Sequence, residues 1–173
     1  MSKEMLENKL IVLSNLPMQS FFRAVDMLVI GFGDIIEVTN WRGQIEKVAQ
    51  YRIHIQSPWR LLLDETVLIA SSDIYEPNTE TEWSENFDWD VFGANLFDEL
   101  CKKKIEKLYN QIFVNEIILD EYGGMRMIFD SGHVLELFSD SSNQETELWR
   151  FFESGKMDSH FVVYVNRVEY TIS

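Results

Sequence analysis

The chain of 173 residues has little of what several protein classes require: one cysteine, three prolines and eight glycines. A single cysteine excludes a disulfide framework and a cysteine-rich zinc module. The scarcity of glycine and proline excludes collagen-like and low-complexity chains. Basic residues are also few, with 15 Lys and Arg against 29 Asp and Glu and a net charge of −14. Because 46% of the residues are hydrophobic, we expect one compact acidic domain over residues 1–173 rather than a disordered chain.

The first residues of the chain do not resemble a targeting segment. Residues 1–7 include Glu4 and Glu7, whereas a signal peptide begins with positive charge only. The first long apolar stretch, residues 24–32, contains Asp26 and is too short to cross a bilayer. We therefore expect a cytoplasmic protein, and the lone Cys101 agrees with a reducing compartment.

Charge also restricts the partners of the chain. A net charge of −14 repels nucleic-acid phosphates and anionic lipid headgroups, so we expect neither nucleic acid nor a membrane as a partner. The one basic cluster, formed by Lys102, Lys103, Lys104 and Lys107, falls in the C-terminal part of a predicted helix. Cations at that end of a helix offset its macrodipole, and we assign this role to the lysines.

Hydrophobic periodicity predicts that most of the chain forms strands. Residues 51–56 alternate apolar and polar side chains, which is the period of a half-buried strand. Residues 59–63 and 67–70 are predicted to form a hairpin, and glycine-containing turns separate the dense strands after residue 112. Residues 27–32 are favoured as a strand, and residues 10–13 are a further strand candidate.

One segment has helical periodicity instead. Its apolar stripe consists of Phe97, Leu100, Cys101, Ile105 and Leu108. The stripe predicts one main helix at about residues 94–109, with Cys101 as a buried small hydrophobe rather than a nucleophile. We therefore expect an α+β fold, with an antiparallel sheet or curled barrel of about eight strands and this helix packed against it.

Acidic residues are concentrated in residues 61–101, which contain eleven Asp or Glu residues and no Lys or Arg. Aromatic side chains are interleaved with these acids before the predicted helix. Two interpretations remain open: the segment is a lid folded over the core, or it is the rim of a surface that binds a basic partner. The candidate partner surface consists of Glu80, Glu82, Trp83, Glu85, Asp88, Trp89 and Asp90.

Residues 88–99 partly match the twelve-residue calcium loop of an EF-hand. Asp88, Asp90 and Glu99 stand at loop positions 1, 3 and 12, and a glycine stands at position 6. Phe92 occupies position 5, however, and has no side-chain oxygen to bind a metal. These three acids are therefore weak metal candidates and we expect no metal, because capping of the following helix by Asp88 or Asp90 explains them better.

No motif indicates a cofactor or covalent catalysis. The Gly-Phe-Gly sequence at residues 31–33 lacks the third glycine of a dinucleotide-binding loop. A Gly-x-Ser-x-Gly nucleophile elbow is absent from the sequence, and the three histidines lie far apart in it. We therefore expect no cofactor, and the absence of a catalytic motif favours a protein that is not an enzyme.

Residues 53–60 read Ile-His-Ile-Gln-Ser-Pro-Trp-Arg, and residues 149–151 read Trp-Arg-Phe. The two motifs resemble those of a family of small bacterial proteins with an (L/I)-H-x-Q-x-x-W-R strand and a C-terminal W-R-F strand. The resemblance covers about residues 25–165 and implies a bacterial, cytosolic source, but it transfers no active site. Because polar groups beside a tryptophan suggest a built site, the candidate binding residues are His54, Gln56, Trp59, Arg60 and Asp73. Alternatively, Arg60 pairs with Asp73 across the hairpin and fixes its register.

Two functional hypotheses follow. The first is a non-enzymatic interaction protein whose acidic face binds a basic protein, for example in an immunity or antitoxin-like role against a basic toxin. The alternative is a small-ligand binder or enzyme with a polar pocket around His54, Gln56, Arg60 and Asp73. Self-association into a homo-oligomer is a third hypothesis.

Overall fold

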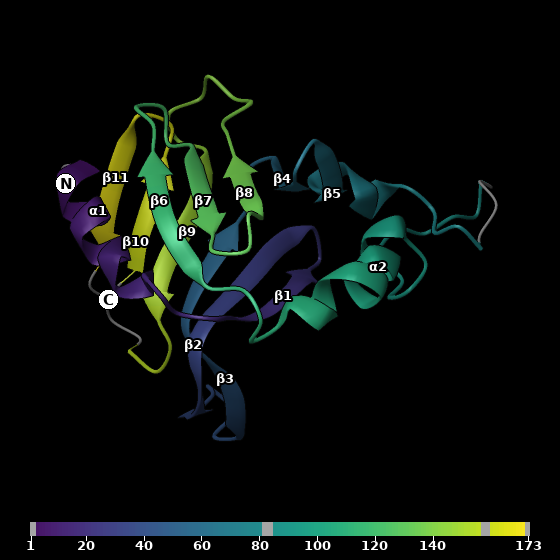
Figure 1. Cartoon of the computed structure of the whole chain (residues 1–173), viewed down its shortest axis with the longest axis horizontal. Coiled ribbons are helices and arrows are strands. Elements are labelled where there is room, and N and C mark those ends of the chain that lie inside the picture. Colours follow the sequence, from purple (N-terminus) through teal and green to yellow (C-terminus); the bar gives the residue numbers. More distant parts are fainter. Residues whose placement is uncertain (1–2, 81–84, 157–159, 172–173) are drawn as a thin grey trace.

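The computed structural model describes residues 3–80, 85–156 and 160–171, which form two antiparallel sheets and several short helical segments (Figure 1). The first sheet has the strand order β1 (Met18–Ala24), β2 (Met27–Thr39), β3 (Ile45–Ile55), β9 (Glu147–Glu153), β10 (His160–Tyr164) and β11 (Arg167–Thr171). The second has the order β5 (Thr66–Ala70), β4 (Trp59–Leu63), β8 (Val134–Leu137), β7 (Met125–Phe129) and β6 (Val114–Leu119). An α+β fold dominated by antiparallel pairing is therefore confirmed.

The number and closure of the strands differ from the expectation. In the part of the chain that the structure describes, eleven strands form two open sheets, rather than one sheet or curled barrel of about eight strands. The chain leaves the first sheet after β3, where the backbone N–H groups of Gln56 and Ser57 both donate to the carbonyl of Leu148. Pro58 follows and has no N–H to continue the ladder, so the next strand, β4, starts the second sheet.

The core lies between the two sheets. Strand register places Phe21, Ile30, Ile53, Phe151 and Phe161 in one row across the first sheet, and all five are buried. The corresponding row of the second sheet contains Leu61, Leu135 and Met127. Because side chains alternate between the faces of a strand, these residues point into a shared layer and form one cluster with residues of both sheets.

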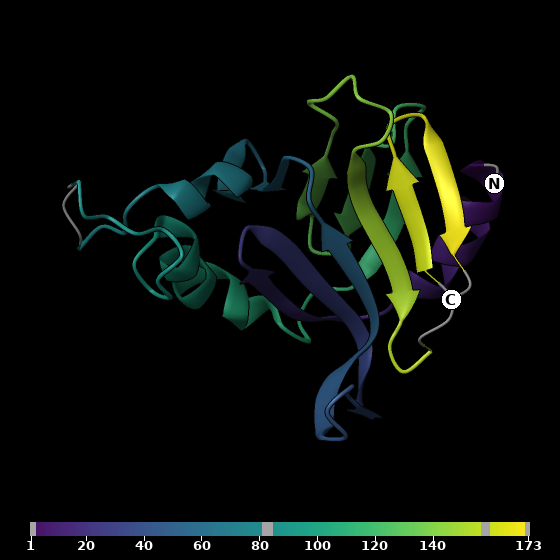
Figure 2. The ribbon, with the colours of Figure 1, turned by 180° about the vertical axis from the view of Figure 1, so that it is seen from behind.

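The N-terminal segment is helical, so the expectation of a strand at residues 10–13 was wrong. Helix α1 spans Lys3–Leu10 and continues into a 3-10 turn at Ile11–Leu13. Leu6, Leu10 and Leu13 are buried and follow the spacing of one helical face. Helix α1 contacts β6 and lies at one end of the long axis of the molecule (Figures 1 and 2).

The predicted helix at residues 94–109 is present, but it changes form along its length. Helix α2 spans Leu96–Leu100, a π-helical turn spans Cys101–Ile105, and a 3-10 turn spans Glu106–Leu108. Within its apolar stripe Phe97, Cys101 and Ile105 are buried. No helix of the described residues is both long and apolar enough to cross a membrane.

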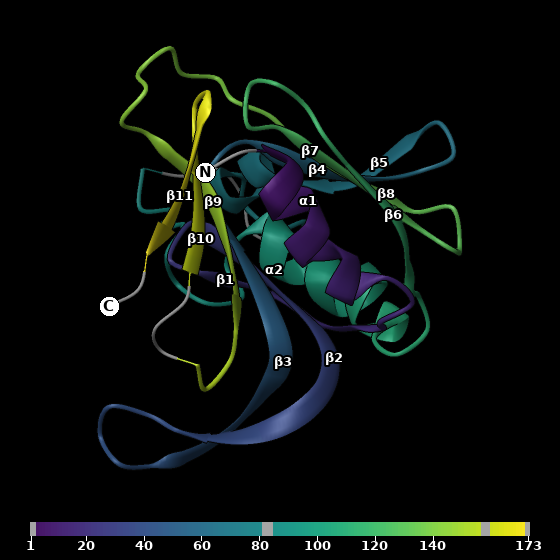
Figure 3. The same cartoon turned by 90° about the vertical axis from the view of Figure 1, so that its left-hand side faces the viewer.

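Strands β2 and β3 are longer than the other strands and bend strongly, as Figure 3 shows. Their register shifts between Phe32 and Ile35, where Gly33 has a φ of +81°. Such an irregularity increases the local bend of a strand. The far halves of both strands consequently extend beyond the rest of the first sheet.

Candidate functional site

Residues 76–80 and 85–95, here called the acidic segment, project from the body at the end of the long axis opposite α1 (Figures 1 and 2). The segment follows a 3-10 turn at Ser71–Tyr75 and leads into α2. Its two ends are joined by a bridge between Pro77 and Asn95 and by backbone hydrogen bonds from Asn78 to Ala94 (2.9 Å) and from Leu96 to Glu76 (2.8 Å). The base of the segment is therefore fixed to the fold.

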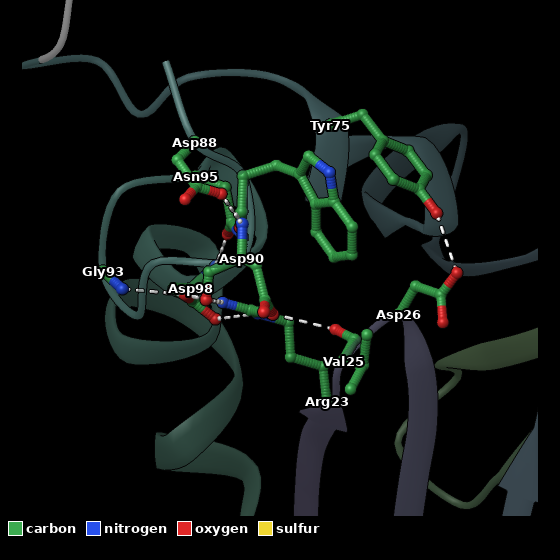
Figure 4. A network of polar contacts seen from close by, with 10 residues as sticks. Arg23, Val25, Asp26, Tyr75, Asp88, Asp90, Gly93, Asn95 and Asp98 are labelled. Carbon is green, nitrogen blue, oxygen red and sulfur yellow. Dashed lines mark hydrogen bonds and ion pairs between the residues drawn. The ribbon is translucent and has the colours of Figure 1, made fainter. Parts of the chain in front are cut away.

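Arg23 of β1 holds the inner side of the acidic segment (Figure 4). Its Nε and Nη2 donate to the two carboxylate oxygens of Asp98 at 2.9 and 3.0 Å. Nη1 also donates to the Val25 carbonyl and to Oδ1 of Asp90, and Nη2 donates to the Asp90 carbonyl. Five hydrogen bonds match the five N–H donors of a guanidinium, so this arginine is fully satisfied.

The Arg23–Asp98 pair is buried, with 6% and 4% of the two side chains exposed. The hydrogen bond from Arg23 to Asp98 raises the pKa of the guanidinium, so the group stays charged. A buried ion pair depends on both partners, because removal of one leaves an uncompensated charge in the interior. Arg23 and Asp98 therefore act as a clamp between the edge strand β1 and the start of α2.

The start of α2 depends on Asn95, which is fully buried. Its Oδ1 accepts a hydrogen bond from the Asp98 backbone N–H at 2.8 Å, which is the contact of a helix N-cap. Its Nδ2 donates to the carbonyl of Trp89 at 2.8 Å. The expectation that Asp88 or Asp90 caps the helix was therefore wrong. Asp88 instead accepts from the backbone N–H of Asp90 and shapes the turn between them.

The weak metal candidates of this segment are occupied by contacts within the protein. Asp90 faces Arg23, whereas Glu99 accepts hydrogen bonds from the backbone and side chain of Thr79 and pairs with Lys103. The hydrogen bonds from Lys103 and Thr79 lower the pKa of Glu99 to about 2. Across residues 3–80, 85–156 and 160–171, no group of three or more His, Cys, Asp or Glu residues is arranged to hold a metal ion.

The outer side of the acidic segment is exposed and carries both charge and aromatic surface. Of the candidate partner surface, Glu80, Glu85, Asp88 and Asp90 are exposed, whereas Trp89 is half-buried. Trp89 packs edge-on against Tyr75, with ring centroids 5.1 Å apart. The other two candidates, Glu82 and Trp83, lie outside the described residues.

Two exposed residues of this region are not part of the candidate partner surface, although Phe92 is one of the aromatic residues that the sequence interleaves with the acids. Phe92 is 88% exposed and Val91 is 53% exposed, at the tip of the turn that ends with Gly93. Gly93 has a φ of +85°, a conformation that L side chains rarely adopt, so the turn requires glycine. The combination of an aromatic residue, acids and a turn glycine was visible in the sequence, whereas the contribution of Arg23 was not.

The five candidate binding residues do not meet in one place. Trp59 is buried in the core, while Gln56 is exposed. Arg60 points to the opposite face from Trp59 and pairs with Glu136 of β8 at 2.8 Å. Asp73 caps the turn at Ser71–Tyr75 by accepting from the Ala70 backbone N–H at 2.8 Å. Arg60 and Asp73 consequently make no pair across the hairpin, contrary to the alternative interpretation.

His54 lies on the outer face of the first sheet in a different group of residues. Its ring contacts Phe152 edge-on at 4.8 Å, and His160 stacks on the same phenyl ring at 4.5 Å. Burial, together with the positive charges of Arg52 and Arg150, lowers the pKa of His54 to about 4. The imidazole is therefore neutral at physiological pH.

Comparisons of the chain with models of protein families, with curated proteins and with solved structures found no match in any of the three. The resemblance of residues 53–60 and 149–151 to a family of small bacterial proteins stays a prediction. Functional interpretation consequently rests on the geometry described above.

Proposed function

We propose that this chain is a non-enzymatic interaction protein that binds a basic protein partner through the acidic segment. An immunity or antitoxin-like role against a basic toxin is the concrete form of this proposal. The observation that carries it is the position of Phe92, which is 88% exposed on a turn surrounded by exposed acids and anchored through a buried ion pair.

Three physical arguments support a binding role for this surface. Exposed aromatic residues are common anchors of protein interfaces, where a few such side chains supply most of the binding energy. The Arg23–Asp98 clamp limits the conformational entropy that the segment loses on binding, which favours affinity. The surrounding carboxylates attract a positive partner over long range and accelerate its association, with a strong dependence on salt.

The alternative function, a pocket for a small ligand or substrate, has no comparable support. His54, Gln56, Arg60 and Asp73 lie on different faces and in different elements, and each has contacts of its own or faces solvent. A ligand site needs polar groups that converge in one cleft. The ligand pocket and self-association of the chain stay hypotheses.

The proposal is tested by affinity capture of the tagged protein from a lysate of its source organism, washed at low and high salt. The test variant combines Glu80→Gln, Glu85→Gln and Asp88→Asn, which removes three exposed charges and keeps the Asp88 oxygen that shapes the turn. The matched control combines Glu7→Gln, Glu37→Gln and Glu116→Gln, three exposed acids elsewhere on the molecule.

We expect the wild type and the control to capture a stoichiometric basic protein that is released at high salt. The test variant should associate with that protein roughly tenfold more slowly, because steering charges act mainly on the association rate. Wild-type samples without a captured protein at either salt concentration would refute the proposal. Equal losses in the test and control variants would refute the role of the acidic segment.

A further inference from the structure

A cavity of about 850 Å³ opens beside the acidic segment, between β1 and the helical residues 96–108. Its aromatic lining includes the buried Phe21 and Phe97 and the partly buried Tyr109. Phe22 of β1, which is 46% exposed, and Phe92 of the acidic segment also line it. The volume lies within the range of pockets that hold small ligands.

The edge of β1 beside this cavity is not free to pair with another strand. Tyr109 donates its hydroxyl hydrogen to the Phe21 carbonyl at 3.0 Å and accepts from the Phe21 N–H at 3.1 Å. Farther along the same edge, Met18 accepts from the Asn110 N–H and donates to the Ile112 carbonyl. An occupant of the cavity is therefore recognised through side chains and not by adding a strand to the sheet.

The charged lining residues favour a positive occupant. Two of the three cations, Arg23 and Lys103, are neutralised by Asp98 and Glu99. The remaining charged lining residues are Glu80, Glu106 and Lys102, so the lining contains four acids and three cations. The lining of the cavity therefore has a small excess of negative charge, and its accessible apolar surface includes aromatic rings.

We infer that the cavity receives a large aromatic side chain from a basic segment of the partner. This inference rests on the proposed function and specifies which part of the partner the acidic segment recognises. Phe22, Phe92 and Tyr109 contact the inserted ring, and Glu80 and Glu106 attract the flanking cations. An aromatic ring buries a large apolar area, and basic neighbours in the same segment satisfy the acidic rim.

The probe for this inference is an acetylated and amidated Arg-Trp-Arg tripeptide, titrated into isotope-labelled full-length protein. A Glu-Trp-Glu tripeptide of the same form serves as the charge-reversed probe. Amide chemical shifts of Phe22, Gly93 and Lys102 report occupancy of the cavity. We expect saturable shifts at these three residues with Arg-Trp-Arg, and at least about tenfold weaker binding of Glu-Trp-Glu.

A matched pair of variants separates the cavity from exposed aromatic surface in general. Phe22→Ser removes part of the cavity wall, whereas Phe138→Ser removes a phenylalanine of nearly equal exposure outside this cavity, 47% against 46%. Phe22→Ser should weaken Arg-Trp-Arg binding about tenfold and Phe138→Ser should leave it unchanged. Absence of saturable shifts, equal binding of the two probes, or equal effects of the two variants would overturn the inference.

The same variants distinguish this inference from the proposed function. If neutralised acids slow association with the basic partner while Phe22→Ser retains full affinity for it, the cavity inference is wrong and the proposed function stands. If Arg-Trp-Arg binds in the cavity but no basic protein is captured, the cavity is a binding site and the proposed function is wrong.

Discussion

At the scale of single residues, alternation along a strand predicts which way a side chain faces but not what it meets there. Residues 51–56 were predicted as a half-buried strand, and Ile53 and Ile55 are indeed buried while His54 lies on the other face. Alternation did not indicate that His54 would meet Phe152 and His160, because both come from residues about a hundred positions later. Such neighbours depend on strand order.

The environment of His54 makes the stability of the protein depend on pH. Its pKa is about 4 in the folded state, against about 6.5 in an unfolded chain. As the pH falls from 6.5 toward 4, the unfolded state binds a proton that the folded state does not, so the free energy of unfolding decreases. We expect His54 to contribute a loss of about 1 kcal/mol between about pH 7.5 and about pH 5, since solvent screens part of the effect.

Urea unfolding of the wild type and of His54→Gln at these two pH values measures this contribution. The wild type should lose more stability than the variant on acidification, since His133, His160 and the carboxylates are present in both. An equal loss in the two proteins would show that His54 does not titrate with a lowered pKa.

At the scale of elements, the helical segment was predicted in place, but its attachment to the sheet was not. The apolar stripe indicated which residues of 96–108 are buried, because the burial of a helix face follows its own periodicity. The clamp between Arg23 and Asp98 joins residues 75 positions apart in sequence. An arginine in a strand usually faces solvent, so no local pattern distinguishes Arg23 from the other arginines.

Removal of the clamp should destabilise the protein and release the acidic segment. Arg23→Met leaves Asp98 buried without its cation, and we expect a loss of about 3–5 kcal/mol in the free energy of unfolding. Adding Asp98→Asn should restore part of this loss, because the amide oxygen still accepts from the Gly93 N–H without an unpaired charge.

Chemical denaturation of these variants tests the prediction, with amide exchange of residues 88–95 as a second measurement. The control is Lys103→Met, which removes a 59% exposed lysine from its pair with Glu99 and should cost far less, because the Thr79 hydrogen bonds to Glu99 remain. A loss in Arg23→Met no larger than in this control would contradict a structural role for the clamp.

At the scale of the whole molecule, the two sheets depend on one another because they share one core. Trp149 of the first sheet is fully buried, and its Nε1 donates to the carbonyl of Gly123 in the turn between β6 and β7 at 2.7 Å. Leu135 of the second sheet is also fully buried in the same cluster. Neither sheet can therefore lose its partner without exposing its own inner face.

This shared core predicts one cooperative unfolding transition. Midpoints of urea unfolding followed by far-ultraviolet circular dichroism and by tryptophan fluorescence should coincide. Leu135→Ala should lower both midpoints together, with a loss of about 2–5 kcal/mol, because it leaves a cavity between the sheets. The exposed Val67→Ala is the control. Two separate transitions, or a shift of one midpoint alone, would show that the sheets unfold independently.

The sequence by itself determined the properties that depend on composition and on local periodicity. These are the acidic charge, the antiparallel α+β class, most strand positions and the buried face of the helical segment. The charge follows from composition, and the other properties follow from the spacing of apolar and polar residues within about a dozen neighbours. Residues 10–13 were wrongly predicted as a strand, although the sequence also contained the leucine spacing of a helix there.

Only the tertiary structure decided which strands share a sheet and which polar residues meet. Arg60 pairs with Glu136 rather than with Asp73, and Arg23 anchors the acidic segment. Both contacts arise because strand pairing and packing bring together residues from distant parts of the chain. Local periodicity states that a face is buried, but it carries no information about the partner of that face. The exposed Phe92 and the cavity beside it follow from this long-range packing, and so does the surface proposed to bind a partner.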